Sequence, residues 1–190
     1  MPTSPADWPD TAWLKRILTA RVYDVAIESP LQSAPKLSAR LGVPVLFKRE
    51  DLQPVHSFKL RVAYQRIAGL SAEERARGVL AVSAGNHAQG VALAAHRLGI
   101  DAVIVMPKTT PPFKIDAVRA YGATIELVGD SYDDAAQHGR TRAAAEGRVM
   151  VHPYDDADVI SGQATVGLEL LRQLPPGPES LIVPVAFSGN

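Results

Sequence analysis

Two short stretches of the chain carry residue types that could do chemistry. The first, "LQPVHSFKLRVAYQ" at 52–65, places Lys59 between Phe58 and Leu60. A lysine in such surroundings usually lays its methylene stem along the apolar surface and keeps its amine in water. The alternative is an amine whose burial favours the neutral form, which can attack an aldehyde. The lysine alone leaves both interpretations open.

The second stretch, "SAGNHAQG" at 83–90, lies between an apolar run and a helical pattern. In open α/β sheets, ligands bind at this junction, beside the carboxyl end of a strand. Free N–H groups at the helix start favour an anion, and Asn86 adds a side-chain amide. A loop without function could equally use a glycine turn with Asn86 as N-cap. Neither a G-x-G-x-x-G nor a G-x-x-x-x-G-K-[ST] motif occurs, which argues against a dinucleotide fingerprint and a P-loop.

The other polar clusters predict no metal site. None of the five histidines forms an H-x-x-x-H pair, and the chain has no cysteine to complete a zinc site. His87 and His152 are the two histidines that could approach a ligand pocket. The acidic "YDDADV" at 154–159 is interpreted as a solvated turn leading into a helix, because carboxylates are favourable near a helix start.

The composition of the chain argues against several classes of function. The 190 residues carry 20 basic and 20 acidic side chains, a balance that argues against a nucleic acid or an anionic membrane as the main partner. The absence of cysteine excludes disulfides and thiolate chemistry. The N-terminal residues lack the pattern of a signal peptide, and no apolar run approaches the ~20 residues of a membrane span. We therefore expect a soluble cytoplasmic protein.

The chain after residue 77 alternates regularly between two kinds of segment. Apolar runs rich in Val, Ile and Leu predict strands within 78–85, 101–107, 123–129 and 148–153. Helical patterns lie between them, at 86–99, 111–122 and 131–147. Capping residues precede these helices and glycines follow them. This alternation predicts an α/β fold with a parallel sheet covered by helices on both faces, in a small subdomain at 66–152.

The flanking segments belong to a different unit. They predict helices at 13–28, within 29–42 and at 158–174, and strands at 43–50 and 181–186. We expect residues 1–65 and 153–190 to form part of a larger cofactor-binding domain into which the subdomain is inserted. Such a sheet would have a long open edge, which folded proteins normally avoid. The fold therefore looks incomplete, as part of something larger.

The two motifs together resemble a known family. "KREDLQPVHSFKLR" followed by "SAGNHAQG" is similar to the pyridoxal-phosphate enzymes of the tryptophan-synthase-β type (fold type II). Within that group the likeness is greatest to biosynthetic threonine dehydratase, also called threonine ammonia-lyase. It covers nearly the whole chain, through the segments "RVYDVAIESPL", "APKLSARLG", "MPKTTPPFKIDAVRAYGA", "VHPYDD" and "GQATVGLEL".

The resemblance implies specific roles for single residues. Lys59 would be the catalytic residue that forms the Schiff base with pyridoxal 5'-phosphate, and Asn86 would hydrogen-bond the cofactor's ring oxygen. Gly189 would belong to the loop that binds the cofactor's phosphate. The substrate carboxylate would be held by the loop residues Ser83, Ala84, Gly85 and His87.

The resemblance also implies an activity. Family members deaminate L-threonine to 2-oxobutanoate and ammonia, the first step of isoleucine biosynthesis, with L-serine as an alternative substrate. A homo-oligomer is expected of the full-length family. Racemases of this fold have a serine at the position of Ala84, where it can exchange a proton, and a methyl group cannot do so. Elimination is therefore expected to dominate over racemisation.

Two departures from the family pattern affect the expected activity. Val62 stands where the family has glycine, and "AFSGN" at 186–190 stands where the glycine-rich phosphate loop should follow. Successive N–H groups in such a loop make a nest for a phosphate, which bulky residues obstruct. A truncated, weakly active or inactive form is therefore expected. Two alternatives stay open: a non-catalytic α/β fragment or interaction module, and a loop that binds another small anion without Schiff-base chemistry.

Overall fold

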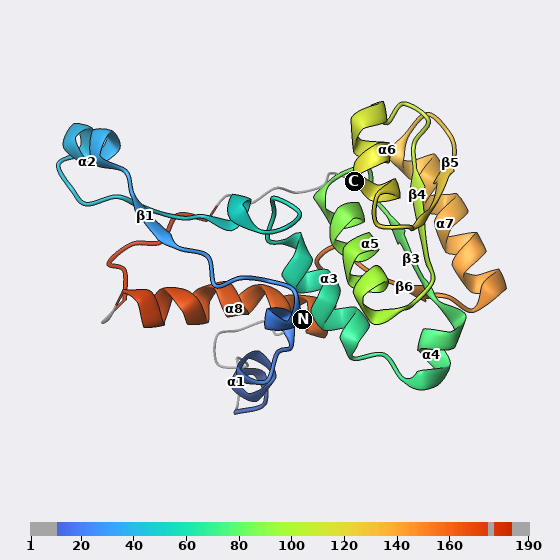
Figure 1. Cartoon of the computed structure of the whole chain (residues 1–190), viewed down its shortest axis with the longest axis horizontal. Coiled ribbons are helices and arrows are strands. Elements are labelled where there is room, and N and C mark those ends of the chain that lie inside the picture. The colour runs from blue at the N-terminus through green and yellow to red at the C-terminus, as the bar shows by residue number, and fades with distance from the viewer. Residues whose placement is uncertain (1–10, 175–176, 184–190) are drawn as a thin grey trace.

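The molecule is elongated, with a helical arm at one end and a small sheet at the other (Figure 1). The computed structural model describes residues 11–174 and 177–183. Helix α2 (Pro35–Leu41) lies at the tip of the arm, and α3 (Lys59–Ala68) lies at the centre. The site residues predicted from the sequence lie around this central helix.

A parallel four-stranded sheet forms the core of the small subdomain. Its strands are β3 (Val79–Val82), β4 (Ala102–Met106), β5 (Thr124–Leu127) and β6 (Val149–Met150). They are arranged in the order β5-β4-β3-β6, and all neighbouring pairs are parallel. Every residue of the two central strands is buried, as expected for a sheet covered on both faces. All four predicted strands are confirmed.

Helices cover both faces of this sheet. Alternate residues of a strand point to opposite faces, so Leu80 packs with α7 (Tyr132–Glu146) while Ala81 packs with α5 (Asn86–Leu98). Helix α6 (Pro112–Arg119) contributes Ile115 and Val118 to the same cluster as α5. The predicted α/β class, with helices on both faces, is confirmed.

The helix boundaries follow the predicted capping chemistry, with one correction. Ser131 forms a capping box with Asp134, and Gly147 ends α7 at φ +66°. The expected Asn86 N-cap is wrong: Gly85 occupies the cap position without a side-chain hydrogen bond, and Asn86 is the first helical residue. The Asn86 amide is therefore not used to cap α5. A short helix that was not expected, α4 (Ala72–Arg77), is capped by Ser71.

The N-terminal flank differs from the predicted single helix at 13–28. Helix α1 (Thr11–Leu18) ends early, and a 3-10 turn, η2 (Val22–Asp24), follows it. Long-range contacts decide this, because the Gln65 side chain accepts a hydrogen bond from the backbone N–H of Arg21 at 2.8 Å, and the Tyr23 hydroxyl donates to Glu169 at 2.8 Å. Tertiary contacts of this kind override a weak helical preference.

The arm is built from a hairpin and a long helix. Strands β1 (Leu31–Ser33) and β2 (Leu46–Lys48) pair antiparallel on either side of α2. A 3-10 turn, η3 (Glu50–Leu52), leads toward α3. The helix predicted at 158–174 is confirmed as α8 (Ala157–Gln173), which runs along the arm (Figure 1).

The prediction of a strand at 181–186 is wrong for residues 181–183, the part that the structure describes. Residues 181–183 form no strand and are exposed, because no described strand lies beside them to pair with their backbone. Residues 184–186 lie outside the described ranges. The division into domains at 65 and 153 stays a prediction. Within 11–174 and 177–183, no helix is both long and apolar enough to cross a membrane.

Candidate active site around Lys59

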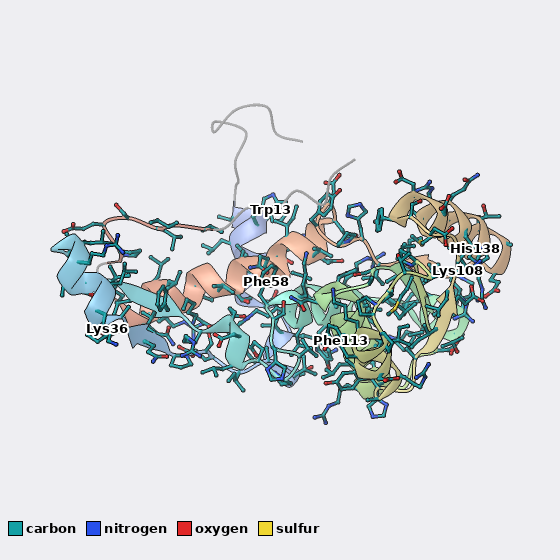
Figure 2. The ribbon with its side chains drawn as sticks, turned by 90° about the horizontal axis from the view of Figure 1, so that it is seen from above. Trp13, Lys36, Phe58, Lys108, Phe113 and His138 are labelled. Carbon is teal, nitrogen blue, oxygen red and sulfur yellow. The ribbon has the colours of Figure 1, made fainter. Side chains whose placement is uncertain are left out.

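Lys59 is the first residue of α3 and lies in partly apolar surroundings. Its Nζ donates a hydrogen bond of 2.6 Å to the carbonyl of Pro153 and lies 5.3 Å from the centre of the Phe58 ring. The side chain is half-buried, and burial lowers the pKa of its amine below the ordinary value of 10.5. Figure 2 labels Phe58 near the middle of the molecule, between Lys36 on the arm and His138 on the small subdomain.

The backbone of Lys59 is held from two sides. Its N–H donates to Ser57 Oγ at 3.2 Å. On the other side α5 presses so closely on α3 that a Cβ added at Gly90 would lie 2.7 Å from the Lys59 carbonyl oxygen. Only glycine permits this approach. The peptide that carries the amine is therefore fixed in position relative to α5.

The loop between β3 and α5 lies at the carboxyl edge of the sheet. Its turn is closed by a hydrogen bond of 3.2 Å from the Gly85 N–H to Ser83 Oγ, and the Ser83 N–H bonds Val105. A Cβ built at Gly85 would meet no atom within 4 Å, so open space adjoins the loop. The N–H groups at the start of α5 lie beside this space and favour an anion.

Asn86 is exposed at the start of α5. It precedes Gly90 by four residues, so both lie on the same face of the helix. Since Gly90 contacts Lys59, this face of α5 is turned toward the start of α3. No hydrogen bond to the Asn86 amide is made within the described part of the chain, which leaves the group available to a ligand.

His87 is buried, with 4% of its surface exposed. Its Nε2 lies 2.9 Å from the carbonyl of Val151 and donates to it, while Nδ1 has no hydrogen-bond partner among the described residues. Burial lowers the pKa of this imidazole to about 4, and the nearby Lys59 adds to the effect. His87 is therefore neutral at physiological pH, with a buried lone pair on Nδ1.

The segment between β6 and α8 supplies two carbonyl groups that the sequence did not reveal. Val151 accepts from His87, and Pro153 accepts from Lys59. Because these are backbone groups, no residue type announces them. The His152 ring is exposed, and its Nδ1 accepts the Asp155 N–H at 2.7 Å within its own turn. His152 also lies near enough to His87 to contribute to the lowered pKa of that imidazole, and its approach to the pocket stays a prediction.

The structure thus places Lys59 beside Gly90 and near His87 of α5, and the loop from Ser83 to Gly85 leads directly into this helix. Ala84 is partly exposed in this loop, and Val62 is buried one turn into α3. Gly189 lies outside the described residues. The acidic turn caps α8, since Asp156 accepts the N–H of Asp158 at 2.8 Å. The described side chains contain no group of three that could hold a metal ion.

Comparisons with known proteins give a consistent result. Residues 22–190 match the family model described as "Pyridoxal-phosphate dependent enzyme". "Threonine dehydratase 1 biosynthetic, chloroplastic" from Solanum lycopersicum is 58% identical over 177 residues, which cover 93% of this chain and 29% of the relative.

Solved structures share the fold. The processed form of threonine deaminase isoform 2 from Solanum lycopersicum has a TM-score of 0.85 at 54% identity, over 86% of this chain and 45% of that one. Maize serine racemase has a TM-score of 0.82 at 36% identity, over 87% of this chain and 50% of that one.

The chain therefore spans about a third or less of the first curated relatives and about half of the solved structures. Its fold is fold type II of the pyridoxal-phosphate enzymes, over that half. Since the family model covers residues 22–190, the chain belongs to the family of pyridoxal-phosphate-dependent enzymes and is similar to its biosynthetic threonine dehydratases.

Proposed function

We propose that the chain carries the catalytic lysine region of an enzyme that deaminates L-threonine to 2-oxobutanoate and ammonia with pyridoxal 5'-phosphate. One observation carries this proposal: the amine of Lys59 is half-buried, has a lowered pKa and lies close enough to His87, near the start of α5, to lower the pKa of that imidazole. The 58% identity to a biosynthetic threonine dehydratase supports threonine as the substrate and isoleucine biosynthesis as the pathway. L-Serine is the alternative substrate.

The residues present fit this cofactor. A lowered pKa gives a larger fraction of neutral amine, the form that condenses with an aldehyde. Asn86 offers an unused amide, and open space adjoins Gly85. Pyridoxal phosphate, when bound, supplies an aldehyde and a ring that accepts the electron pair of a breaking Cα–H bond.

With the cofactor bound, Lys59 would have a second task. Its free amine would accept the proton from Cα of threonine and return it to the departing β-hydroxyl, which would leave as water. A water molecule adds back when the product hydrolyses to 2-oxobutanoate and ammonia. The Pro153 carbonyl, 2.6 Å from Nζ, is the group that holds the released amine in place.

The loop residues bind and orient the substrate. In this proposal the substrate carboxylate lies at the start of α5, among Ser83, Ala84, Gly85 and His87, where the N–H groups favour an anion. Ala84 carries only a methyl group, so it cannot deliver a proton to the opposite face of Cα. Elimination is therefore proposed as the main reaction, although the fold is shared with a serine racemase.

The test is a visible absorption spectrum with and without added pyridoxal phosphate. We expect a band that is lost in Lys59→Ala, and borohydride reduction that fixes the cofactor on the peptide containing Lys59. Label mainly on Lys48, Lys108 or Lys114 would refute the assignment. A chain that only binds an anion at the loop, or a non-catalytic module, would show no band in the wild type.

Substrate turnover and assembly depend on a whole enzyme, and the match to a threonine dehydratase covers only 29% of that relative's length. Ammonia release from threonine and the homo-oligomer expected for the family stay predictions for this chain. Size-exclusion chromatography and a coupled assay for 2-oxobutanoate test them directly.

A further inference from the structure

A buried ion pair closes the loop that carries Lys59. Arg61 is fully buried, and its guanidinium donates to both carboxylate oxygens of Glu50, each at 2.8 Å. Glu50 begins η3, nine residues before Lys59, and Arg61 follows Lys59 by two residues. Lys59 therefore lies within a chain segment, residues 50–61, whose two ends are joined by one bidentate pair.

The loop is fixed at further points between these ends. Gln53, 1% exposed, clamps the backbone of Ile27 by accepting its N–H at 3.0 Å and donating to its carbonyl at 2.8 Å. The side chain of Val55 is buried in a cluster with Leu60. His56 has φ +55°, a conformation that few residues other than glycine adopt. Such a conformation persists only where the surroundings fix it.

The Arg61 guanidinium also hydrogen-bonds Glu169, a residue of α8. It donates to the two carboxylate oxygens of Glu169 at 2.6 and 3.1 Å, and Lys48 Nζ lies 2.6 Å from the same carboxylate. Two cations and two carboxylates thus balance their charges in the interior. Burial alone would lower the pKa of Arg61, but the hydrogen bonds to Glu50 and Glu169 raise it above its ordinary value.

We propose that the Glu50–Arg61 pair is a positioning pair for Lys59, an inference that rests on the function proposed above. A bidentate arginine–carboxylate pair is directional, so it sets an angle as well as a distance. Here it orients the first turn of α3 relative to η3 and thereby keeps the methylene groups of Lys59 partly buried. Loosening the pair would let the amine move into water, where the charged form is favoured.

A purely structural role makes a different prediction. An ion pair that only stabilises the fold would lower the melting temperature when it is removed, and the remaining folded molecules would keep a normal Lys59. A positioning role changes the reactivity of Lys59 in folded protein. Amine reactivity and thermal stability therefore separate the two roles.

The experiment measures labelling by pyridoxal phosphate and borohydride near pH 8, at a temperature where each variant is folded by circular dichroism. Mass spectrometry gives the ratio of label on Lys59 to label on Lys108, which is exposed after β4. If the Lys59 amine moved into water, its pKa would rise toward the ordinary value, and its neutral fraction and its labelling would fall. We expect a severalfold fall in the labelling ratio in Glu50→Gln and a smaller one in Glu50→Asp, whose carboxylate is one methylene shorter.

The control is Glu126→Gln, which removes a carboxylate paired with Arg142 and His138 in the small subdomain. It should change the melting temperature and leave the labelling ratio at the wild-type value. If Glu50→Gln does not fold, Glu50→Asp decides in the same way. A wild-type ratio in the folded Glu50 variant overturns the positioning role and leaves the proposed function standing. Failure of the wild type to label Lys59 selectively overturns both.

Discussion

Protonation of His87 should destabilise the fold as the pH falls below neutral. Burial lowers the pKa of this imidazole to about 4 in the folded protein, against an ordinary value of 6.5. In the unfolded chain the ring is hydrated and titrates near the ordinary value. Between these two values the unfolded state binds a proton that the folded state does not. The stability is therefore fully present above pH 6.5 and is lost as the pH falls toward 4.

The magnitude follows from the shift. The difference of 2.5 units between 6.5 and about 4, at 1.36 kcal/mol per unit, gives a limit of roughly 3 kcal/mol. At pH 4.5 about 2.5 kcal/mol of this would already be lost. A small domain has a total stability of only about 5–15 kcal/mol, so the effect is large enough to measure by urea titration.

The assay compares wild type with His87→Gln at pH 7.5 and pH 4.5. Glutamine can still donate to the Val151 carbonyl but does not titrate, so the pH-dependent loss should shrink by about 2.5 kcal/mol. Other titrating groups contribute equally to both proteins and cancel in the difference. His96→Gln, an exposed histidine on the same helix, is the control and should keep the wild-type pH dependence. The reasoning is wrong if His87→Gln loses as much stability as the wild type.

Three further predictions concern packing, capping and the site loop. Gly90→Ala places a Cβ 2.7 Å from the Lys59 carbonyl oxygen and should lower the free energy of unfolding by about 1–3 kcal/mol. Its control, Gly167→Ala, meets nothing within 4 Å and should raise the free energy of unfolding by roughly 0.5–1 kcal/mol. Equal melting temperatures of the two variants would contradict this. Ser131→Ala removes the capping box of α7 and should cost about 1 kcal/mol in a urea titration; an unchanged midpoint would show that the cap contributes nothing. Ala84→Ser introduces a hydroxyl that can exchange a proton, so D-serine formation should rise in a full-length relative carrying this loop; racemisation that does not change would refute the assigned role.

The small subdomain could be predicted because its signals are local. Each strand is a short apolar run, and each helix has its start and stop chemistry within the same few residues. The N-cap of α7, Ser131, for example, pairs with a residue only three positions away, Asp134. The same signal was present at Ser71, where "SAEE" fits a capping box, and α4 could have been predicted from it.

The arm was harder to predict than the small subdomain, because its structure is determined by contacts between residues far apart in the sequence. Residues 19–28 have a helical pattern, but Tyr23 donates to Glu169 and Tyr64 donates to Asp24, so long-range bonds shape this segment. The buried pair between Arg61 and Glu169 joins residues 108 positions apart. Nothing in the order of residues marks such a pairing. Similarly, a motif could point to Lys59, but the carbonyl groups around it have no side-chain signature.

The packing of α3 explains how one flexible side chain can serve a site that needs a fixed geometry. Helix α3 lies between α5 and α8, and each neighbour approaches it through a glycine (Figure 1). A Cβ at Gly90 would lie 2.7 Å from the Lys59 carbonyl, and one at Gly162 would lie 2.8 Å from the Arg61 carbonyl. Both contacts fix the backbone of the first turn and leave the lysine side chain untouched.

This arrangement separates two requirements. In the proposed function the amine must move, because it would bond the cofactor in one state and carry a proton in another. Its Cα must not move, because a displacement of about 1 Å can cost a factor of 100 in rate. Backbone contacts at Gly90 and Gly162, with the buried Glu50–Arg61 pair, hold the Cα of Lys59 in place. The four methylene groups of Lys59 then provide the whole of the required motion, and the Pro153 carbonyl provides a defined resting position for the free amine.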